Sequence, residues 1–461
     1  MHRQQVFGGA LAATVLVLTA LSAQPQGQGR AVVYEGGRVI VGDGSAPIDN
    51  GAIVVENGRI SAVGKNGAVN VPSGAERVDL AGKTVMPTLV NTHIHIGYDK
   101  FTSWGAENYG PANIVDHLKR EAYFGVGAVM SVGGDPTDSA NAFAKQQQAR
   151  PEPGAARFFF APGMAPPNGG PDHILIKGTT ALKAVYDVSN AAEARTAIAT
   201  AAGKGVKYVK IWVDDRRGTY PKMTPDAYET LITEAHKRGM IVIAHATTMA
   251  DSKAVLRAGA DMQIHMPYAD TLDAEYLALL KEKKPIVVPI VGLINTLRGS
   301  NKPICGGEPL VEEAFDAATL AHIRKENCEK KEGAVNFQTR IPENLKQMVQ
   351  AGIRIVLGTD AGVFNNWTFG WTDHLELENY VKLGGLSNGE AIVAGTSRAA
   401  EFIGAKDLGT LAAGKSADFL VLNANPLDDI RNTRQIARVY LRGQLVDRQA
   451  IRAAWRATTL Q

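Results

Sequence analysis

Six residues between positions 93 and 360 have side chains of the types that bind pairs of divalent metal ions. They are His93, His95, Lys210, His245, His265 and Asp360. Each lies at or near the C-terminal end of a short apolar, β-branched segment, and such segments are typical of buried strands. Imidazole and carboxylate groups suit zinc and similar ions. In a (β/α)8 barrel the C-terminal strand ends converge on one face, so these residues can meet there around two ions.

Lys210 is the unusual member of this set, because it lies within the apolar segment 208–212. Burial disfavours the charged form of an amine and lowers its pKa. A neutral amine can take up carbon dioxide, and the resulting carboxylated lysine is an anionic ligand with two oxygens that can bridge two ions. The alternative is an ordinary lysine whose amine reaches solvent from a strand end.

The elements that must position these residues follow an alternating strand and helix pattern. We expect strands at 85–91, 128–132, 158–161, 208–212, 241–244, 262–264, 286–290 and 355–357. Helical patterns lie between them, for example at 226–238 and 342–351. This alternation predicts the α/β class and a TIM-like (β/α)8 barrel over residues 85–405. A long excursion at 292–340 follows the seventh strand and contains a helical pattern at 311–332.

Both ends of the chain have short strands separated by tight turns. Residues 31–84 contain several, and Asn57-Gly58 between two of them is a hairpin signal. Residues 406–461 contain matching strands before a short tail. We therefore expect one β-sandwich, built from an N-terminal part (31–84) and a C-terminal part (406–461), beside the barrel.

Residues 1–23 have the pattern of a signal peptide. His2 and Arg3 precede an apolar run, and Ser22-Ala23 offers a small-residue cleavage site before a polar linker at 24–30. The alternative is an uncleaved membrane anchor, but the run at 6–21 is short for a span of about 20 residues. Cleavage predicts a periplasmic or secreted protein with no stable membrane association.

Charge and cysteine content narrow the class of protein further. The formal net charge is 49 − 46 = +3, without a dense Lys/Arg cluster, which argues against nucleic acid or acidic lipid as partners. A homo-oligomer acting on a small-molecule substrate is expected. Cys305 and Cys328, both in the excursion, should form a disulfide in an oxidising compartment. The alternative is two unpaired thiols held apart by the fold.

The order of the six residues resembles that of the amidohydrolase superfamily, with His-x-His after the first strand and Asp after the eighth. The stretch at 409–422, followed by Asn425-Pro426-Leu427, resembles the C-terminal signature of the imidazolonepropionase-like and Xaa-Pro-dipeptidase-like branch. Two positions depart from the family pattern: Asn91 stands where aspartate is usual, and Met266 stands where glycine is usual. The resemblance implies a barrel beside a two-part sandwich.

The resemblance also implies roles for the ligands. His93, His95 and Asp360 would hold the more buried ion, His245 and His265 the other, and carboxylated Lys210 would bridge them, with zinc as the expected metal. A metal-activated hydroxide would attack a carbon–nitrogen bond in an amide, dipeptide or cyclic amide, and Asp360 would act as general base and then acid. An esterase, lactonase or phosphotriesterase is the alternative. A non-catalytic binding protein is a third, against which the intact ligand set argues.

Five further residues are candidates for contact with substrate. Arg216, Arg217 and Tyr220 follow the fourth strand, where relatives hold a substrate carboxylate with basic and tyrosyl groups, so the substrate is expected to bear a carboxylate. The alternative is a solvated loop in which the arginines pair with Asp214 or Asp215. His173 and His374 lie in the third and eighth strand loops and are otherwise loop or capping groups. The remaining histidines of helical or excursion segments, His117, His236 and His322, are expected at the surface.

Overall fold

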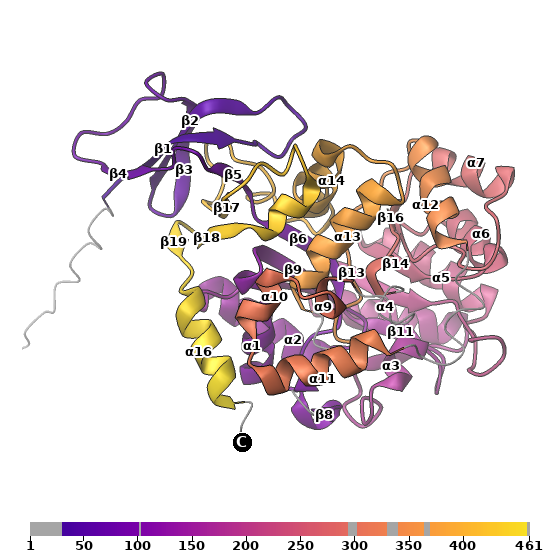
Figure 1. Ribbon diagram of the computed structural model, residues 1–461. Coiled ribbons are helices and arrows are strands. Elements are labelled where there is room, and N and C mark those ends of the chain that lie inside the picture. Colours follow the sequence, from indigo (N-terminus) through magenta and orange to yellow (C-terminus); the bar gives the residue numbers. More distant parts are fainter. Residues whose placement is uncertain (1–29, 101–102, 294–301, 330–339, 364–368, 459–461) are drawn as a thin grey trace, which may run out of the picture.

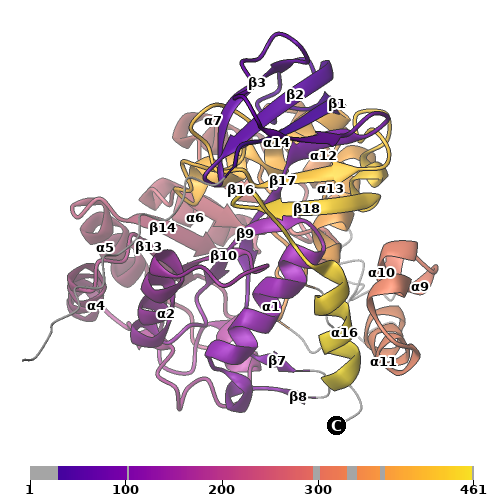
Figure 2. The same cartoon turned by 90° about the vertical axis from the view of Figure 1, so that its left-hand side faces the viewer.

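The computed structural model describes residues 30–100, 103–293, 302–329, 340–363 and 369–458. In this part of the chain, a mixed sheet lies at one end of a larger α/β body (Figures 1 and 2). None of the helices described there is both long and apolar enough to cross a bilayer. The signal peptide and linker predicted for residues 1–23 and 24–30 lie outside the described residues, apart from Arg30.

The mixed sheet contains strands from both ends of the chain. Its eight strands are β1 (Val32–Val39), β2 (Ile48–Glu56), β3 (Arg59–Lys65), β4 (Glu76–Asp79), β5 (Thr84–Pro87), β17 (Phe419–Leu422), β18 (Ile436–Leu441) and β19 (Gln444–Leu445). β5 and β17 pair antiparallel and so join the N-terminal and C-terminal segments. The rings of Tyr34, Phe419 and Tyr440 pack together, with centroids 4.6 to 5.0 Å apart. Burial of these rings gives the two chain ends a common apolar core.

The α/β body is built on two parallel sheets. One contains β6 (Leu89–Ile94), β9 (Val126–Val132) and β10 (Arg157–Ala161). The other contains β11 (Gly163–Ala165), β12 (Val185–Asp187), β13 (Tyr208–Trp212), β14 (Ile241–His245), β15 (Met262–Ile264) and β16 (Ile286–Val288). Only Pro162 separates β10, which pairs with β9, from β11, which pairs with β13. Parallel sheets of this kind are consistent with the TIM-like fold expected from the sequence.

Helices alternate with these strands and surround them (Figure 2). They are α1 (Pro111–Tyr123), α2 (Thr137–Ala149), α4 (Ala191–Gly203), α5 (Pro225–His236), α6 (Met249–Ala258), α7 (Ala274–Lys283), α12 (Ile341–Gln350), α13 (Trp371–Lys382), α14 (Asn388–Gly395) and α15 (Ser397–Phe402). The predicted helices 226–238 and 342–351 correspond to α5 and α12. Side-chain caps fix several starts; Thr224, for example, accepts the backbone N–H of Ala227 at the start of α5.

Two predicted strands differ from the structure. The expected strand 85–91 is two strands, since β5 belongs to the mixed sheet and β6 to the α/β body. The expected strand 355–357 is reduced to isolated bridges, in which Ile355 pairs with Val287 of β16 and Ala361 pairs with Ile94 of β6. The segment 355–361 is nevertheless held on both sides, and it carries Asp360.

The excursion after β16 contains three described helices, α9 (Lys302–Cys305), α10 (Pro309–Ala314) and α11 (Ala317–Cys328). The single helical segment expected at 311–332 is therefore divided, because Asp316 caps a new helix by accepting the N–H of Thr319. The sulfurs of Cys305 and Cys328 are 2.02 Å apart and form a disulfide that joins the ends of α9 and α11. The C-terminal helix α16 (Arg448–Thr458) packs against α1.

Candidate metal centre

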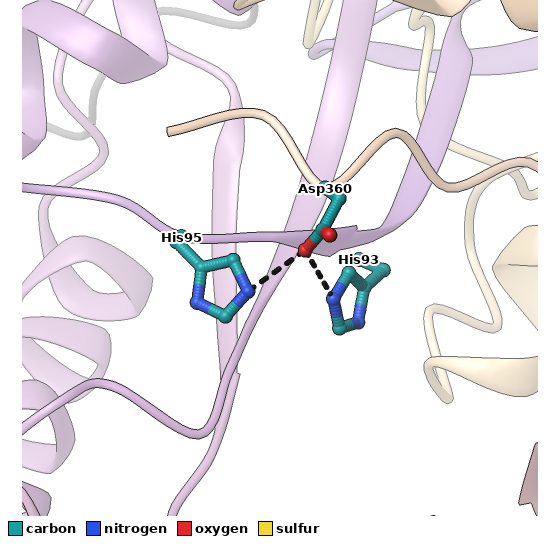
Figure 3. A group of neighbouring side chains, drawn as sticks. All are labelled: His93, His95 and Asp360. Atoms are coloured by element: carbon teal, nitrogen blue, oxygen red, sulfur yellow. Dashed lines mark hydrogen bonds and ion pairs between the residues drawn. The ribbon is translucent and has the colours of Figure 1, made fainter. Parts of the chain in front are cut away.

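The first group of possible metal ligands lies where β6 meets the segment after residue 355. The Nε2 atoms of His93 and His95 are each 2.9 Å from the same oxygen, Oδ1 of Asp360 (Figure 3). All three side chains are buried. Alternation along β6 would place positions 93 and 95 on one side of the strand, and the observed convergence on one point agrees with that spacing.

Asn91, two residues before His93 in β6, supports this group. Its Oδ1 accepts the backbone N–H of His93 at 3.0 Å, and its Nδ2 donates to Thr359 Oγ1 at 2.8 Å. The amide therefore links the strand that carries the histidines to the segment that carries Asp360. An aspartate, the usual residue in the family, has no N–H with which to make the second bond.

The second group combines two histidines at the ends of β14 and β15 with an aspartate from the loop after β11. Asp172, His245 and His265 each present a ligand atom, and these atoms lie within 4.8 Å of one another. His265 Nε2 is 4.0 Å from Asp360 Oδ2, so the two groups adjoin. The backbone φ angles of His265 (65°) and Asp360 (60°) are left-handed. That conformation is unfavourable for residues other than glycine, and it persists where surrounding structure fixes a functional side chain.

Lys210 lies in β13 and is fully buried. Its Nζ has no hydrogen-bond partner and lies 5.0 Å from the centre of the Trp212 ring. Burial lowers the pKa of Lys210 to about 8, against the opposing charges of Asp172 and Asp360. About a tenth of the amine would then be neutral at pH 7, far more than for an ordinary lysine, and carboxylation requires the neutral amine.

The protonation states of His93 and Asp360 are those of metal ligands. Burial, and then the charge of Lys210, lower the pKa of His93 to about 3, so its imidazole is neutral. Burial alone would raise the pKa of Asp360, but the hydrogen bonds and charges of His93 and His95 outweigh it and hold that pKa well below its usual range. A neutral imidazole and an ionised carboxylate bind a divalent ion without first losing a proton. The residues present therefore fit a divalent metal.

His245 differs from the other histidines because two carboxylates flank its ring. Its Nε2 is 2.8 Å from Asp214 Oδ2, and its Nδ1 is 3.3 Å from Asp172 Oδ2. Burial lowers the pKa of His245, but Asp172 and Asp214 outweigh burial and raise it. The two carboxylates therefore favour a positive charge, from a proton or a metal ion, at this position.

A cavity of about 320 Å³ opens beside the second group. It is lined by Asp214, Arg216, Arg217, Thr247, Thr248, Tyr268, Ala269 and Asp270. The hydroxyl of Tyr268 contacts Nδ1 of His265. Of the predicted substrate contacts, Arg216 and Arg217 thus lie at the cavity, and the cavity connects them to the ligands through Tyr268.

The environment of Arg216 does not suit it to hold a substrate carboxylate. Its guanidinium is 3.1 Å from Asp172 Oδ1 and 3.4 Å from Asp214 Oδ2. The two carboxylates of the site already balance its charge, as the paired-loop alternative anticipated for Asp214. Arg217 is exposed and keeps its place as a candidate contact. Tyr220 is not among the residues lining the cavity, and its backbone N–H donates to Asp215 O.

The two remaining candidates, His173 and His374, do not join the site. His374 is buried between Thr433 Oγ1, at 2.9 Å from its Nδ1, and Phe124 O, at 2.8 Å from its Nε2. These contacts tie α13 to other parts of the body and occupy both ring nitrogens, so the structure does not bring His374 to the site. His173 is buried in α3 (Pro171–Leu175), directly after Asp172, and does not line the cavity.

Sequence reasoning missed Asp172 and Tyr268 and gave Asp214 only a pairing role. Asp172 precedes a histidine that was singled out, and Asp214 follows the strand that carries Lys210. Acidic residues that directly follow a predicted barrel strand were a usable signal for Asp214. No comparable signal marks Tyr268, since a tyrosine in a loop is common.

Comparison with known proteins agrees with this site. The chain matches the model of the amidohydrolase family over residues 84–446. It is 25% identical to the ochratoxinase of Aspergillus niger over 460 aligned residues, which cover 91% of this chain and 87% of that protein. It is 36% identical to the imidazolonepropionase of Deinococcus radiodurans over 101 residues, covering 21% of this chain and 25% of that protein.

Solved structures agree on the fold. A Xaa-Pro dipeptidase with bound methionine superposes with a TM-score of 0.69 at 22% identity, covering 90% of this chain and 99% of that one. The family match, the ochratoxinase and imidazolonepropionase relatives and this fold confirm the resemblance inferred from the ligand order and the C-terminal signature. The chain belongs to the amidohydrolase family.

Proposed function

We propose that this protein is a metal-dependent hydrolase that cleaves an amide-type carbon–nitrogen bond in a small molecule. One observation carries the proposal: two buried groups of metal-ligand type adjoin each other, and the partnerless amine of Lys210 is buried in the neighbouring strand. Relatives named ochratoxinase, imidazolonepropionase and Xaa-Pro dipeptidase support the reaction class.

The ligand assignment follows from the two groups. His93, His95 and Asp360 would hold one divalent ion, His245 and His265 the second, and Lys210, once carboxylated, would bridge them. Nitrogen and carboxylate donors favour zinc. When bound, such a pair of ions activates water and polarises the carbonyl of the substrate.

The protein's own groups supply the proton transfers. His93 and His95 both contact Oδ1 of Asp360, and its other oxygen, Oδ2, would accept a proton from the attacking water. It would return that proton to the leaving nitrogen, as a general base and then a general acid. The hydroxyl of Tyr268 contacts Nδ1 of His265, so Nε2 would be the nitrogen that binds the ion. Arg217, at the cavity, is the proposed contact for a substrate carboxylate.

The full architecture is part of the proposal. We infer that the two parallel sheets and the segment 355–361 close into one (β/α)8 barrel, which the bridges from that segment to β16 and β6 support. The mixed sheet would be the two-part sandwich of the family. Assembly of the protein into a homo-oligomer stays a prediction.

Metal content and a substrate panel test this function. The purified protein should contain about two divalent ions per chain, and removing them with a chelator should abolish hydrolysis of N-acyl amino acids and dipeptides. Matched esters, lactones and phosphotriesters serve as controls. Faster turnover of any of these than of every amide would favour the alternative enzyme classes, and a protein that binds metal and hydrolyses none of the panel would favour a binding role.

A further inference from the structure

We propose that Asp172 is a further protein ligand of the second metal ion, beside His245, His265 and the bridging Lys210. This inference rests on the proposed function. It adds to the second ion a carboxylate ligand that the order of residues in the family does not include. Asp172 lies in the loop between β11 and β12, at the start of the short helix α3. It is buried, with 2% of its surface exposed.

The first argument is the separation of the donor atoms. Asp172 Oδ2 is 3.3 Å from His245 Nδ1, and His245 Nδ1 has no hydrogen-bond partner. Two donors about 2.0–2.1 Å from a tetrahedral zinc ion lie about 3.3 Å apart. The two atoms thus have the spacing of neighbouring ligands on one ion.

The second argument concerns the other nitrogen of His245. Nε2 is 2.8 Å from Asp214 Oδ2, which also accepts a hydrogen bond from Thr247 Oγ1 at 3.2 Å. Because an ionised carboxylate only accepts hydrogen bonds, Nε2 must carry the proton and donate it. In the neutral ring, Nδ1 then presents a lone pair toward the carboxylate of Asp172. Two buried lone pairs that face each other require a cation between them.

The third argument concerns the hydrogen bonds that Asp172 accepts. Trp212 Nε1 donates to its Oδ2 at 2.7 Å, and Arg216 donates to its Oδ1 at 3.1 Å. An oxygen of a carboxylate accepts two partners, so Oδ2 keeps one position free on the side of His245. Arg216 also lies 3.4 Å from Asp214 Oδ2. One arginine thus holds both carboxylates in place, with Asp214 as a positioning residue and Asp172 as the ligand.

Cobalt(II) binding to the metal-free full-length protein tests the assignment. Wild type should bind two ions, and Asp172→Asn should retain one while binding the other at least about tenfold more weakly. Asparagine keeps the size of the side chain but loses its charge. Asp215→Asn is the matched control, because Asp215 lies in the same loop as Asp214 and pairs with Lys222 instead of a ligand. That control should bind two ions as wild type does.

A second variant keeps the test decisive if Asp172→Asn does not fold. Asp172→Cys places a soft ligand at the same position, and bound cobalt should then give a thiolate-to-metal charge-transfer band that wild type lacks. Unchanged affinity for both ions in Asp172→Asn, or a cobalt-loaded Asp172→Cys protein without this band, would overturn the assignment and leave a proton as the cation at His245. Wild-type protein that binds no cobalt would instead contradict the proposed function.

Discussion

At the scale of single residues, Lys210 lies in an environment that disfavours its charged form. Lys210 is enclosed in β13 without a hydrogen-bond partner, and burial depresses its pKa to about 8. An ordinary lysine would destabilise the fold at this position. Conversion to an anion that binds cations on both sides would remove that penalty, so the residue is explained by its proposed modification.

Replacement of Lys210 tests this explanation. Lys210→Ala should lower kcat/KM by more than about 100-fold, because the bridging ligand is lost. Short-chain carboxylic acids should restore part of the activity by occupying the space left by the side chain. Kinetics with and without added acid measure the rescue, and the same acid should not stimulate wild type. Near-normal turnover and full metal content without added acid would remove the bridging role.

The two arginines of the cavity should behave differently when each is replaced. Arg216→Ala should weaken metal binding and lower kcat, since Arg216 holds the carboxylates beside His245. Arg217→Ala should raise KM by about tenfold for substrates with a carboxylate, and much less for neutral amides, because a charge-assisted contact is worth about 1.5–3 kcal/mol. Steady-state kinetics on a matched pair of substrates separate the two effects. A raised KM for both substrates alike would exclude Arg217 from carboxylate binding.

At the scale of elements, the segment after residue 355 is not a regular strand, but backbone hydrogen bonds to β6 and β16 hold it, so its turn geometry matters. Gly362 has a φ of 86°, and a Cβ added there would lie 1.9 Å from the carbonyl oxygen of His95. The backbone that carries one ligand therefore passes directly over the backbone that carries another. Only a residue without a side chain fits between them.

Gly362→Ala should accordingly destabilise the protein by more than about 2 kcal/mol, from backbone strain together with the clash. Gly352→Ala is the matched control, because Gly352 has a similar φ of 72° but open space around it. The control should lose only about 1 kcal/mol. Urea unfolding of both variants gives the comparison, and equal losses would show that the contact with His95 has no energetic effect.

The sequence predicted elements best where hydrophobic pattern alone decides them. The strand expected at 208–212 is β13, and those expected at 241–244 and 262–264 agree with β14 and β15 within one residue. The pattern could not reveal the break at Thr88, since both halves are apolar and β-branched and differ only in their pairing partners. It also could not place Asp172, whose approach to His245 depends on the path of a loop.

Burial of polar residues on helices was the weakest part of the sequence prediction. His117 has charged neighbours in sequence and was expected at the surface, but it is fully buried and its ring stacks on Phe369 at 4.2 Å. His374 is buried in the same way. Both rings find hydrogen-bond partners in other elements, which the local sequence does not contain. His236 is exposed as expected, with its side chain 41% accessible.

At the scale of the whole molecule, buried carboxyl groups make stability depend on pH. Glu376 in α13 is fully buried and accepts the backbone N–H groups of Val291 and Gly292 at 2.8 and 2.5 Å. Burial raises its pKa from 4.5 to about 7, although these hydrogen bonds oppose the rise. The folded state therefore holds a proton that the unfolded state releases between these two values.

Stability should consequently fall as the pH rises from about 4.5 to about 7, and Glu376 should account for roughly 3 kcal/mol of that fall. Glu376→Gln cannot ionise, so its unfolding free energy should lack this part of the slope. Urea unfolding of both proteins over this range gives the difference. Parallel curves would show that Glu376 is not protonated in the folded state.

We propose that the protein is exported, on the basis of the N-terminal pattern at 1–23 and the disulfide between Cys305 and Cys328. Disulfides persist in the periplasm and outside the cell. The mature protein should therefore begin near residue 24 and contain no free thiol. N-terminal sequencing and thiol titration after denaturation check both points. A protein recovered with its first residues intact and two free thiols would place it in a reducing compartment.

The direct connection of β5 to β6 limits which parts of this protein can be removed. Only Thr88 separates β5 from β6. β5 is a strand of the mixed sheet, and β6 is the strand that carries His93. The mixed sheet also captures the far end of the chain through β17, and Thr88 itself donates its backbone N–H to Asp418 O. The sheet is thus not an accessory module that an engineer could trim or exchange. A shortened protein without the mixed sheet would need another element to hold β6, the strand that carries His93, in place.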